Sequence, residues 1–346
     1  MGSIVDIKKF KSQTNDVIVI DGLWGTGKSL LSPIISGMDR VEKYKSNYIY
    51  EYFCQLEYLG KVDRNTSVEM LKYLSDIDQY DNLIGREVNL RMADDSGFLK
   101  NPGSMRYIKR IFGRQGDSFV DRINNNNIAL TLMTHMALLV SEPIFEAFKE
   151  RLRLIEVVRH PVYMFSHWCS AFEGFERSRD AKLSFDVNGN KIPWFVDSQE
   201  WTNQYASANT FERAANALIK LYLMLFKKLD SMRQEDIKRL LVISFEELVF
   251  ETEKSTTSLS VFLGRSHSKS LKKILKKQKI PRKISFKGHG HAYYGFDSKS
   301  KLSERQKYEE TLNELQLNIS SSLFTDFLLL IDEYNHRFPG KLSQLS

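Results

Sequence analysis

Residues 16–31, DVIVIDGLWGTGKSLL, constrain the fold of this chain more than any other stretch of its sequence. Four apolar β-forming residues at 17–20 lead into a glycine-rich turn, and the apolar spacing of a helix begins directly after the turn. This order predicts a buried strand, a tight loop and a helix. In open α/β sheets ligands lie beyond the carboxyl ends of the strands, so the loop is a candidate binding site.

The loop, residues 22–29, matches the pattern G-x-x-x-x-G-K-[ST] at every fixed position. Glycines allow positive φ and close backbone approach, so successive N–H groups can point at one anion. Lys28 adds a positive charge, and the helix N-terminus adds its dipole. We therefore predict a cradle for a 5′-diphosphate or a mixed anhydride of phosphate and sulfate. The residues assigned to it are Gly22, Gly25, Thr26, Gly27, Lys28 and Ser29.

The remaining periodicity predicts an α/β fold: a P-loop three-layer sandwich with a mostly parallel central sheet and helical insertions. Buried strands are expected at 128–133, 152–158 and 240–243, and weak alternation predicts one more at 47–53. Residues 81–103 are polar without periodicity and predict a surface loop. Helices are expected at 68–74, 145–151, 208–229, 304–317 and 323–334.

A length of 346 residues with 42% hydrophobic residues fits a single domain over 1–346. Residues 170–206 break the pattern with aromatic and charged side chains and are expected to form an insertion over the active site, and residues 300–346 a helical C-terminal extension. No run approaches the ~20 apolar residues of a membrane span. Two cysteines without C-x-x-C spacing and an N-terminus without an apolar signal favour a cytoplasmic location.

Two of the predicted strands are followed by residues whose side chains could take part in binding or catalysis. The strand at 128–133 runs into Thr134 and His135, and an imidazole beside the cradle is a candidate general base. The strand at 152–158 is followed by Arg159, and Ser166 lies seven residues later. An arginine fork and a hydroxyl near a helix N-terminus can hold a second phosphate.

Four features follow one another along the chain: the loop, the Thr-His pair, the R-x-P-x-x-x-x-S element at 159–166 and the stretch LLVISFEELVFETEKSTTSLSVFLG at 240–264. In this order they resemble the sulfotransferases that use 3′-phosphoadenosine 5′-phosphosulfate (PAPS). The resemblance covers roughly residues 16–295, with gaps at 40–125 and 170–205. It implies that the loop binds the 5′-phosphosulfate, that Arg159 and Ser166 bind the 3′-phosphate, and that His135 is the base. A late K-G element in the family suggests Lys287 as a further phosphate ligand.

One departure from the family pattern concerns a loop lysine. The family carries it two places before the position of Gly25, where this chain has Leu23. Lys28 is therefore the catalytic cation that the resemblance leaves, beside His135. The implied reaction moves a sulfuryl group from PAPS, without a metal, to a hydroxyl or amine of a small-molecule acceptor, with a carbohydrate among the candidates.

Two alternatives remain open at this point. A P-loop kinase would hold ATP and magnesium through Ser29 and an acidic strand end, for which Glu246 or Glu247, or a recruited Asp94 or Asp95, are candidates. A nucleic-acid-binding protein would use the basic run at 269–287, which supplies much of the net charge of +7. That run lacks interleaved aromatic residues, so a solvated helix face is the preferred interpretation and no nucleic-acid partner is expected.

Overall fold

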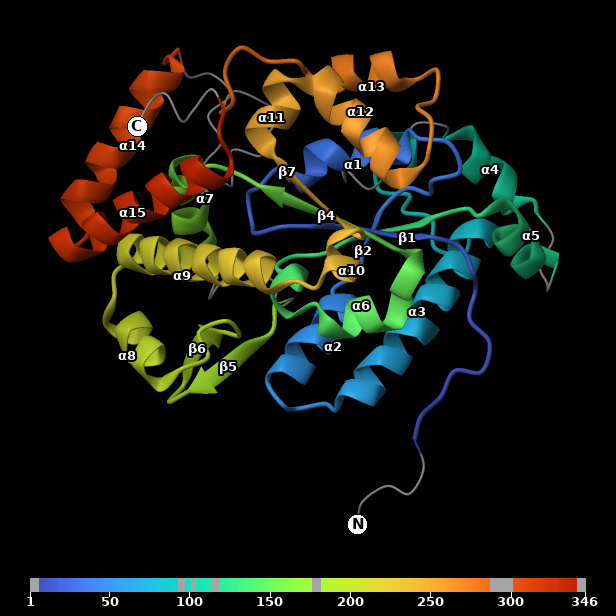
Figure 1. Ribbon diagram of the computed structural model, residues 1–346, viewed down its shortest axis with the longest axis horizontal. Coiled ribbons are helices and arrows are strands. Elements are labelled where there is room, and N and C mark those ends of the chain that lie inside the picture. The colour runs from blue at the N-terminus through green and yellow to red at the C-terminus, as the bar shows by residue number, and fades with distance from the viewer. Residues whose placement is uncertain are drawn as a thin grey trace.

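In the computed structural model, residues 6–92, 97–100, 104–113, 118–175, 182–286 and 301–340 are described. A parallel sheet of five strands in the order β2-β3-β1-β4-β7 runs through the centre, with helices on both faces (Figure 1). The strands are β1 Val17–Asp21, β2 Lys45–Ser46, β3 Leu130–Met133, β4 Leu152–Val158 and β7 Leu240–Ser244. The α/β fold class predicted from the sequence is thereby confirmed.

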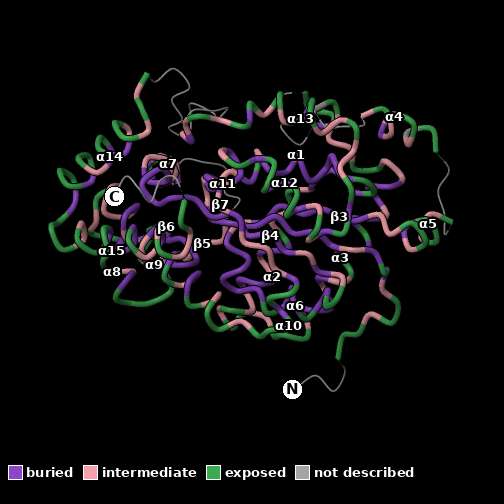
Figure 2. The backbone as a smooth tube through the Cα atoms, turned by 45° about the horizontal axis from the view of Figure 1, so that its top comes forward, coloured by how far each residue is buried: buried purple, intermediate pink, exposed green. Residues whose placement is uncertain are grey.

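Two layers of helices cover the sheet, because successive side chains of a strand point to opposite faces. Val17 and Val19 pack into one buried cluster, and Ile18 and Ile20 into the other. The buried part of the backbone in Figure 2 follows the strands and the helix faces turned toward them. The second cluster includes side chains of α1 Lys28–Ser36, α11 Phe245–Phe250, α12 Thr252–Leu263 and α13 Leu271–Gln278.

The larger cluster lies on the other face and holds the long helices. It includes side chains of α2 Ile49–Tyr58, α3 Arg64–Ile84, α6 Glu142–Phe148, α7 Pro161–Glu173, α9 Thr210–Ser231, α14 Glu304–Asn318 and α15 Ser321–Arg337. The remaining elements are β5 Ser184–Val187, β6 Asn190–Pro193, α4 Met105–Ile111, α5 Ser118–Asn126, α8 Gln199–Ser207, α10 Gln234–Ile237 and short 3-10 turns at Phe98–Lys100, Ala137–Val140 and Lys149–Arg151. Helices α14 and α15 pack against α7 and α9.

The prediction of a strand at residues 47–53 is wrong, because these residues begin α2. Their aromatic and β-branched side chains favour a strand locally, but Tyr50 and Cys54, one helical turn apart, are both buried in the core. The only strand there is the short β2 at the sheet edge. Tertiary packing has overridden local propensity.

The helix expected at 68–74 is longer than predicted and forms α3. Asp63 caps its start by accepting a hydrogen bond from the N–H of Thr66, and Gly85 ends it with φ of 76°. The loop expected at 81–103 therefore begins four residues late. Asp94 and Asp95 lie outside the described residues.

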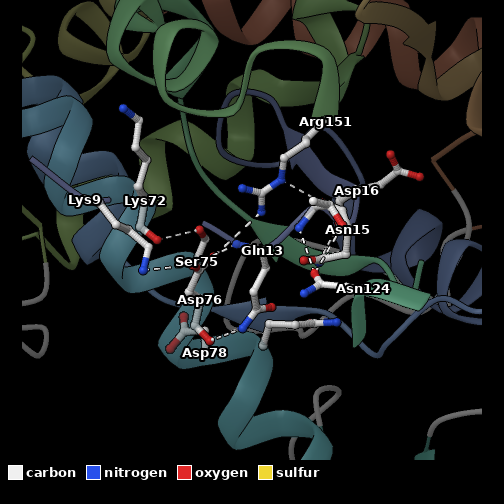
Figure 3. A network of polar contacts seen from close by, with 12 residues as sticks. Lys9, Gln13, Asn15, Asp16, Lys72, Ser75, Asp76, Asp78, Asn124 and Arg151 are labelled. Atoms are coloured by element: carbon white, nitrogen blue, oxygen red, sulfur yellow. Dashed lines mark hydrogen bonds and ion pairs between the residues drawn. The ribbon is translucent and has the colours of Figure 1, made fainter. Parts of the chain in front are cut away.

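A network of polar contacts ties the N-terminal segment to α3 (Figure 3). Lys9 pairs with Asp76 at 2.9 Å, and the backbone N–H of Gln13 donates to the same carboxylate. Arg151, just before β4, donates to the carbonyl of Asn15 at 2.8 Å. These contacts fix the chain where it enters β1, at the amino-terminal end of the strand. The glycine-rich loop follows the other end.

The basic run forms α13 and the turn after it. Ile274 is buried, and its Cδ1 lies 2.4 Å from the position that a Cβ on Gly37 would occupy, which places α13 against the end of α1. The outward face carries exposed lysines at 272, 273, 276 and 277. In the part of the chain that the structure describes, no helix is both long and apolar enough to cross a membrane.

Candidate active site

The glycine-rich loop joins β1 to α1. Gly27 is the N-cap of α1 with φ of 97°, and it offers no side chain to cap the first helical turn. A Cβ on Gly27 would lie 2.3 Å from the Phe245 ring, and one on Gly22 would lie 2.4 Å from the Val157 carbonyl oxygen. Both positions therefore require glycine. The first turn of α1 has no side-chain cap, and a helix N-terminus favours negative charge.

Lys28 extends under the loop. Its Nζ donates to the carbonyl oxygens of Gly22 and Leu23 at 2.6 and 2.7 Å, and the residue is 6% exposed. Burial lowers the pKa of Lys28 to about 8, against the opposing effect of Asp21 and Glu156. The ammonium thus fixes the loop from inside, close to where an anion held by the backbone would need a positive charge.

Two carboxyl groups lie beneath the loop, on neighbouring strands. Asp21 ends β1 and is opposite Glu156 of β4 in the sheet register. Asp21 accepts hydrogen bonds from the Thr134 hydroxyl at 2.8 Å and the Leu138 N–H at 2.6 Å. Burial and the neighbouring Asp21 raise the pKa of Glu156 well above its ordinary value. Through these contacts the two carboxyl groups link β1, which leads into the loop, to the turn after β3 and to β4.

On one side of the loop lies a pair of arginines near the ring of one phenylalanine. Arg159, directly after β4, is 2% exposed, donates to the Gly25 carbonyl at 3.0 Å and lies 4.4 Å from the Phe245 ring centroid. Arg282 lies 5.9 Å from the same centroid, and burial together with Arg159 lowers its pKa to about 10. Arg282 also donates to the carbonyls of Lys279 and Gln278, so two cations are held beside the same ring, next to the loop.

Helix α7 begins beside this arginine pair. Its N-cap, His160, accepts from the Val162 N–H through Nδ1, and the His167 ring lies 2.8 Å from where a Cβ on Gly25 would be. Ser166, adjacent to His167, is half-buried on the same helix. The hydroxyl of Tyr222 on α9 is bonded to the backbone of Arg159. The turn that carries Arg159 is thus held from both sides.

His160 predicts a specific pH dependence of stability. It is fully buried, and burial lowers its pKa to about 3, below an unfolded value near 6.5. The unfolded chain therefore binds a proton that the folded chain excludes as the pH falls from about 6.5 toward 3. Between pH 7 and 5 the wild type is expected to lose about 2 kcal/mol more unfolding free energy than His160→Asn, which keeps an N-cap.

Urea unfolding at both pH values measures this difference, and groups shared by the two proteins cancel in the comparison. Equal losses in the wild type and in His160→Asn would contradict a buried, neutral imidazole at position 160.

On the opposite side of the loop lies His135. The backbone N–H groups of Thr134 and Met136 donate to the carbonyls of Ile20 and Gly22, which places the histidine directly beside the cradle. The carboxylate of Glu51 on α2 accepts from the His135 N–H at 2.7 Å and lies 3.5 Å from its Nδ1. The Tyr48 ring stacks on the imidazole with centroids 5.7 Å apart. Glu51 therefore anchors the backbone of His135, whereas its separation from Nδ1 is longer than an ordinary hydrogen bond.

His135 lines a narrow pocket with a cavity volume of about 20 Å³. Trp24 of the loop forms one wall, stacked on the buried Trp168 at 4.8 Å. The complete lining is Trp24, Tyr48, Glu51, Tyr52, Gln55, His135, Met136, Phe175, Lys182, Leu183, Pro193, Trp194 and Phe195. The pocket is therefore mostly aromatic, and part of it comes from the segment expected to form an insertion over the site.

The structure brings most of the predicted site residues together, with some differences in role. Thr26 is buried and donates to the Leu23 carbonyl, whereas Ser29 is exposed in the first turn of α1. Lys287 lies outside the described residues. Sequence reasoning missed Arg282. A signal for it existed, since Pro281 ends a lysine-rich helical stretch and places the next basic side chain in a turn.

Several solved structures of sulfotransferases resemble this chain, at low sequence identity. No family model matches the chain, and no curated protein matches it. Among solved structures, the sulfotransferase domain from the Synechococcus PCC 7002 olefin synthase matches with 11% identity and a TM-score of 0.46, covering 97% of this chain and all of that domain.

Two other similar structures are also sulfotransferases. The sulfotransferase domain from the curacin biosynthetic pathway has 11% identity and a TM-score of 0.41, covering 88% of this chain and 98% of its own. Mouse sulfotransferase SULT7A1 complexed with PAP (adenosine 3′,5′-bisphosphate) has 13% identity and a TM-score of 0.36, covering 95% and 91%. At such identities and TM-scores the matches carry no argument about activity, which therefore depends on the geometry of the site.

Proposed function

We propose that this chain is a sulfotransferase that moves a sulfuryl group from PAPS to a hydroxyl or amine of an acceptor. The observation that carries the proposal is that the glycine-rich loop lies between a pair of arginines and a histidine. The arginine pair, Arg159 and Arg282, lies on one side of the loop around Phe245, and His135 lies on the other side in an aromatic pocket.

The chemistry of the donor fits these groups. PAPS carries a phosphosulfate at one end and a ribose phosphate at the other, and so needs two separate anion sites. The cradle of Gly25, Gly27 and the α1 N-terminus suits the first, and the arginine pair suits the second. Phe245 is buried against Gly27 and Arg159, and its packing therefore links the two positions.

The roles of the chain's own groups follow from their positions. The donor, when bound, supplies the sulfuryl group. His135, whose backbone N–H is held by Glu51, accepts the proton of the acceptor hydroxyl. Lys28 and the loop N–H groups stabilise the negative charge left on the departing phosphate, an effect of about 3 kcal/mol for each well-placed donor. Arg159, held by the Gly25 carbonyl, keeps the nucleotide in register.

The kinase alternative has weaker support from the carboxylates near the loop. Asp21 is bonded to Thr134 and Leu138, and the pKa of Glu156 is raised. Glu246 is buried and accepts from the His160 N–H at 3.0 Å and the Tyr334 hydroxyl at 3.1 Å. Asp21 and Glu246 therefore already have hydrogen-bond partners, and the raised pKa of Glu156 disfavours the charged carboxylate that magnesium would need.

Calorimetry with PAP and with ATP plus magnesium tests the proposal. We expect PAP to bind at least about tenfold more tightly than ATP with magnesium. Only PAP has a phosphate on the 3′ oxygen of the ribose, which the arginine pair is proposed to bind. Arg282→Gln is expected to weaken PAP binding, and Lys283→Gln, its exposed neighbour, to leave it unchanged. Preferential binding of ATP with magnesium would favour the kinase.

A further inference from the structure

A basic cavity lies apart from the glycine-rich loop, between the segment after α1 and the helices α4 and α5. Its volume is about 620 Å³, which is within the range of small-molecule sites. Among the described residues that line it, the cationic ones are Arg40, Arg106, Lys109, Arg110 and Arg122, and the acidic one is Glu42. The lining therefore carries an excess of positive charge, which favours an anionic ligand.

The cavity and the candidate active site lie at opposite ends of the sheet. Asn126 and Ile128 line the cavity and precede β3, whereas His135 follows that strand. The four residues of β3 alone span about 13 Å. Among the described residues, the cavity and the aromatic pocket share no lining residue. Helices α4 and α5 lie at the end of the molecule away from α14 and α15 (Figure 1).

Two of the arginines in the lining are half-buried and held in place. Arg110 donates to both carboxylate oxygens of Glu42, at 2.7 and 2.8 Å. Arg106 donates to the Tyr107 hydroxyl at 2.9 Å and to the Val41 carbonyl at 3.0 Å. Their guanidinium carbons lie 4.9 Å (Arg110) and 5.0 Å (Arg106) from the centroid of the Tyr107 ring. Both guanidinium groups are thus ordered without a ligand, which lowers the entropic cost of binding one.

Glu42 balances only one of the positive charges. Burial opposes its ionisation, but the hydrogen bonds and charge of Arg110 hold its pKa below the ordinary value, so the carboxylate is charged. Both of its oxygens are bonded to Arg110. The Nε of Arg106 is buried, and no described residue accepts a hydrogen bond from it. A buried donor of this kind is stabilised when an acceptor reaches it.

Three exposed cations complete the basic lining: Arg40 after α1, Lys109 of α4 and Arg122 of α5. Within the part of the chain that the structure describes, none of these three side chains makes a hydrogen bond or an ion pair. They come from three separate segments, so they can contact different anionic groups of one ligand.

We propose that this cavity binds a small polyanion, a molecule that carries at least two phosphate or sulfate groups. Guanidinium groups match the oxygen geometry of both. A nucleic-acid backbone fits less well, because the cations line a cavity of limited volume instead of following a stripe along the surface. The site is independent of the proposed sulfotransferase function, since neither the glycine-rich loop nor Arg159 contributes to it.

Calorimetry of the full chain with sodium triphosphate at low ionic strength tests this site. The double variant Arg40→Gln/Arg122→Gln removes two exposed charges and no described side-chain contact, so it is expected to unfold at the same urea concentration as the wild type. Its affinity for triphosphate should be at least about tenfold lower. The affinity of the wild type should itself fall as salt is added, because exposed charges are screened.

The matched control is Lys272→Gln/Lys273→Gln, which removes the same charge from the exposed face of α13. Its affinity for triphosphate should stay within about twofold of the wild type, since these lysines do not line the cavity. Equal losses in the two double variants would overturn the proposal. Undiminished affinity in Arg40→Gln/Arg122→Gln would also overturn it, because triphosphate would then bind elsewhere.

Parallel titrations identify the kind of anion. Inorganic phosphate should bind more weakly than triphosphate, and equal affinities would contradict a site for several anionic groups. A trisulfated heparin disaccharide distinguishes sulfate from phosphate, and tighter binding of either, lost in Arg40→Gln/Arg122→Gln, supports the cavity and names its source. Binding of a duplex oligonucleotide without binding of triphosphate or the disaccharide would overturn the small ligand. Absence of PAP binding would overturn the proposed function and leave this site unaffected.

Discussion

Replacing Gly27 with alanine is expected to lower PAP affinity by at least about a hundredfold and to destabilise the fold by about 2–4 kcal/mol. The backbone at Gly27 has φ of 97°, which strains any residue with a Cβ. The added carbon would also lie 2.3 Å from Cδ2 of Phe245, a side chain that is 4% exposed. Phe245 cannot move without displacing Arg159, which lies over its ring. Either adjustment distorts the cradle.

Gly60→Ala separates the two causes. Gly60 has φ of 64°, and nothing lies within 4 Å of the place where its Cβ would be. This control should cost only about 1 kcal/mol and leave PAP binding unchanged. Calorimetry and denaturant unfolding on both variants measure the effects. Normal PAP affinity in Gly27→Ala would mean that the loop does not hold the nucleotide.

Removing the imidazole of His135 is expected to lower kcat by about 10²–10⁴-fold while leaving PAP affinity within about twofold. The two effects separate because His135 lies on the acceptor side of the loop, and Arg159 and Arg282 lie on the other. His135→Ala keeps the backbone N–H that donates to Glu51, so α2 remains attached to the turn after β3.

His336→Ala is the control, since His336 is exposed in the last turn of α15. Single-turnover measurements with saturating donor isolate the chemical step from product release. A variant at position 135 that retains full turnover would show that another group accepts the proton.

The elements predicted well from sequence are those whose signal is local. Strand β1 and the loop after it follow from a run of apolar residues and a fixed glycine pattern, and the structure has both where expected. Strands β3, β4 and β7 likewise carry their own hydrophobic runs. Residues 47–53 failed because their sequence suits a strand, while burial of Tyr50 and Cys54 on one helical face decided the outcome.

The site was predictable to the extent that its residues follow strand ends. His135 and Arg159 do, and parallel strands bring their carboxyl ends to one edge. Arg282 and Lys182 do not. They come from segments rich in charged residues, where one cation resembles its neighbours, and only the folded chain brings them to Phe245 and Trp24. Their chemistry depends on contacts across more than 35 positions in sequence, which no local pattern records.

Trp24 belongs to two places at once, because it is part of the glycine-rich loop and also a wall of the aromatic pocket. Its backbone carbonyl accepts from the Trp168 indole at 3.0 Å, and the two indole rings stack at 4.8 Å. The Lys182 ammonium lies 3.6 Å from the centroid of its ring, so a ligand in the pocket would change the surroundings of the indole. The intrinsic fluorescence of the chain should therefore change when either ligand binds, giving an optical titration of both without a label.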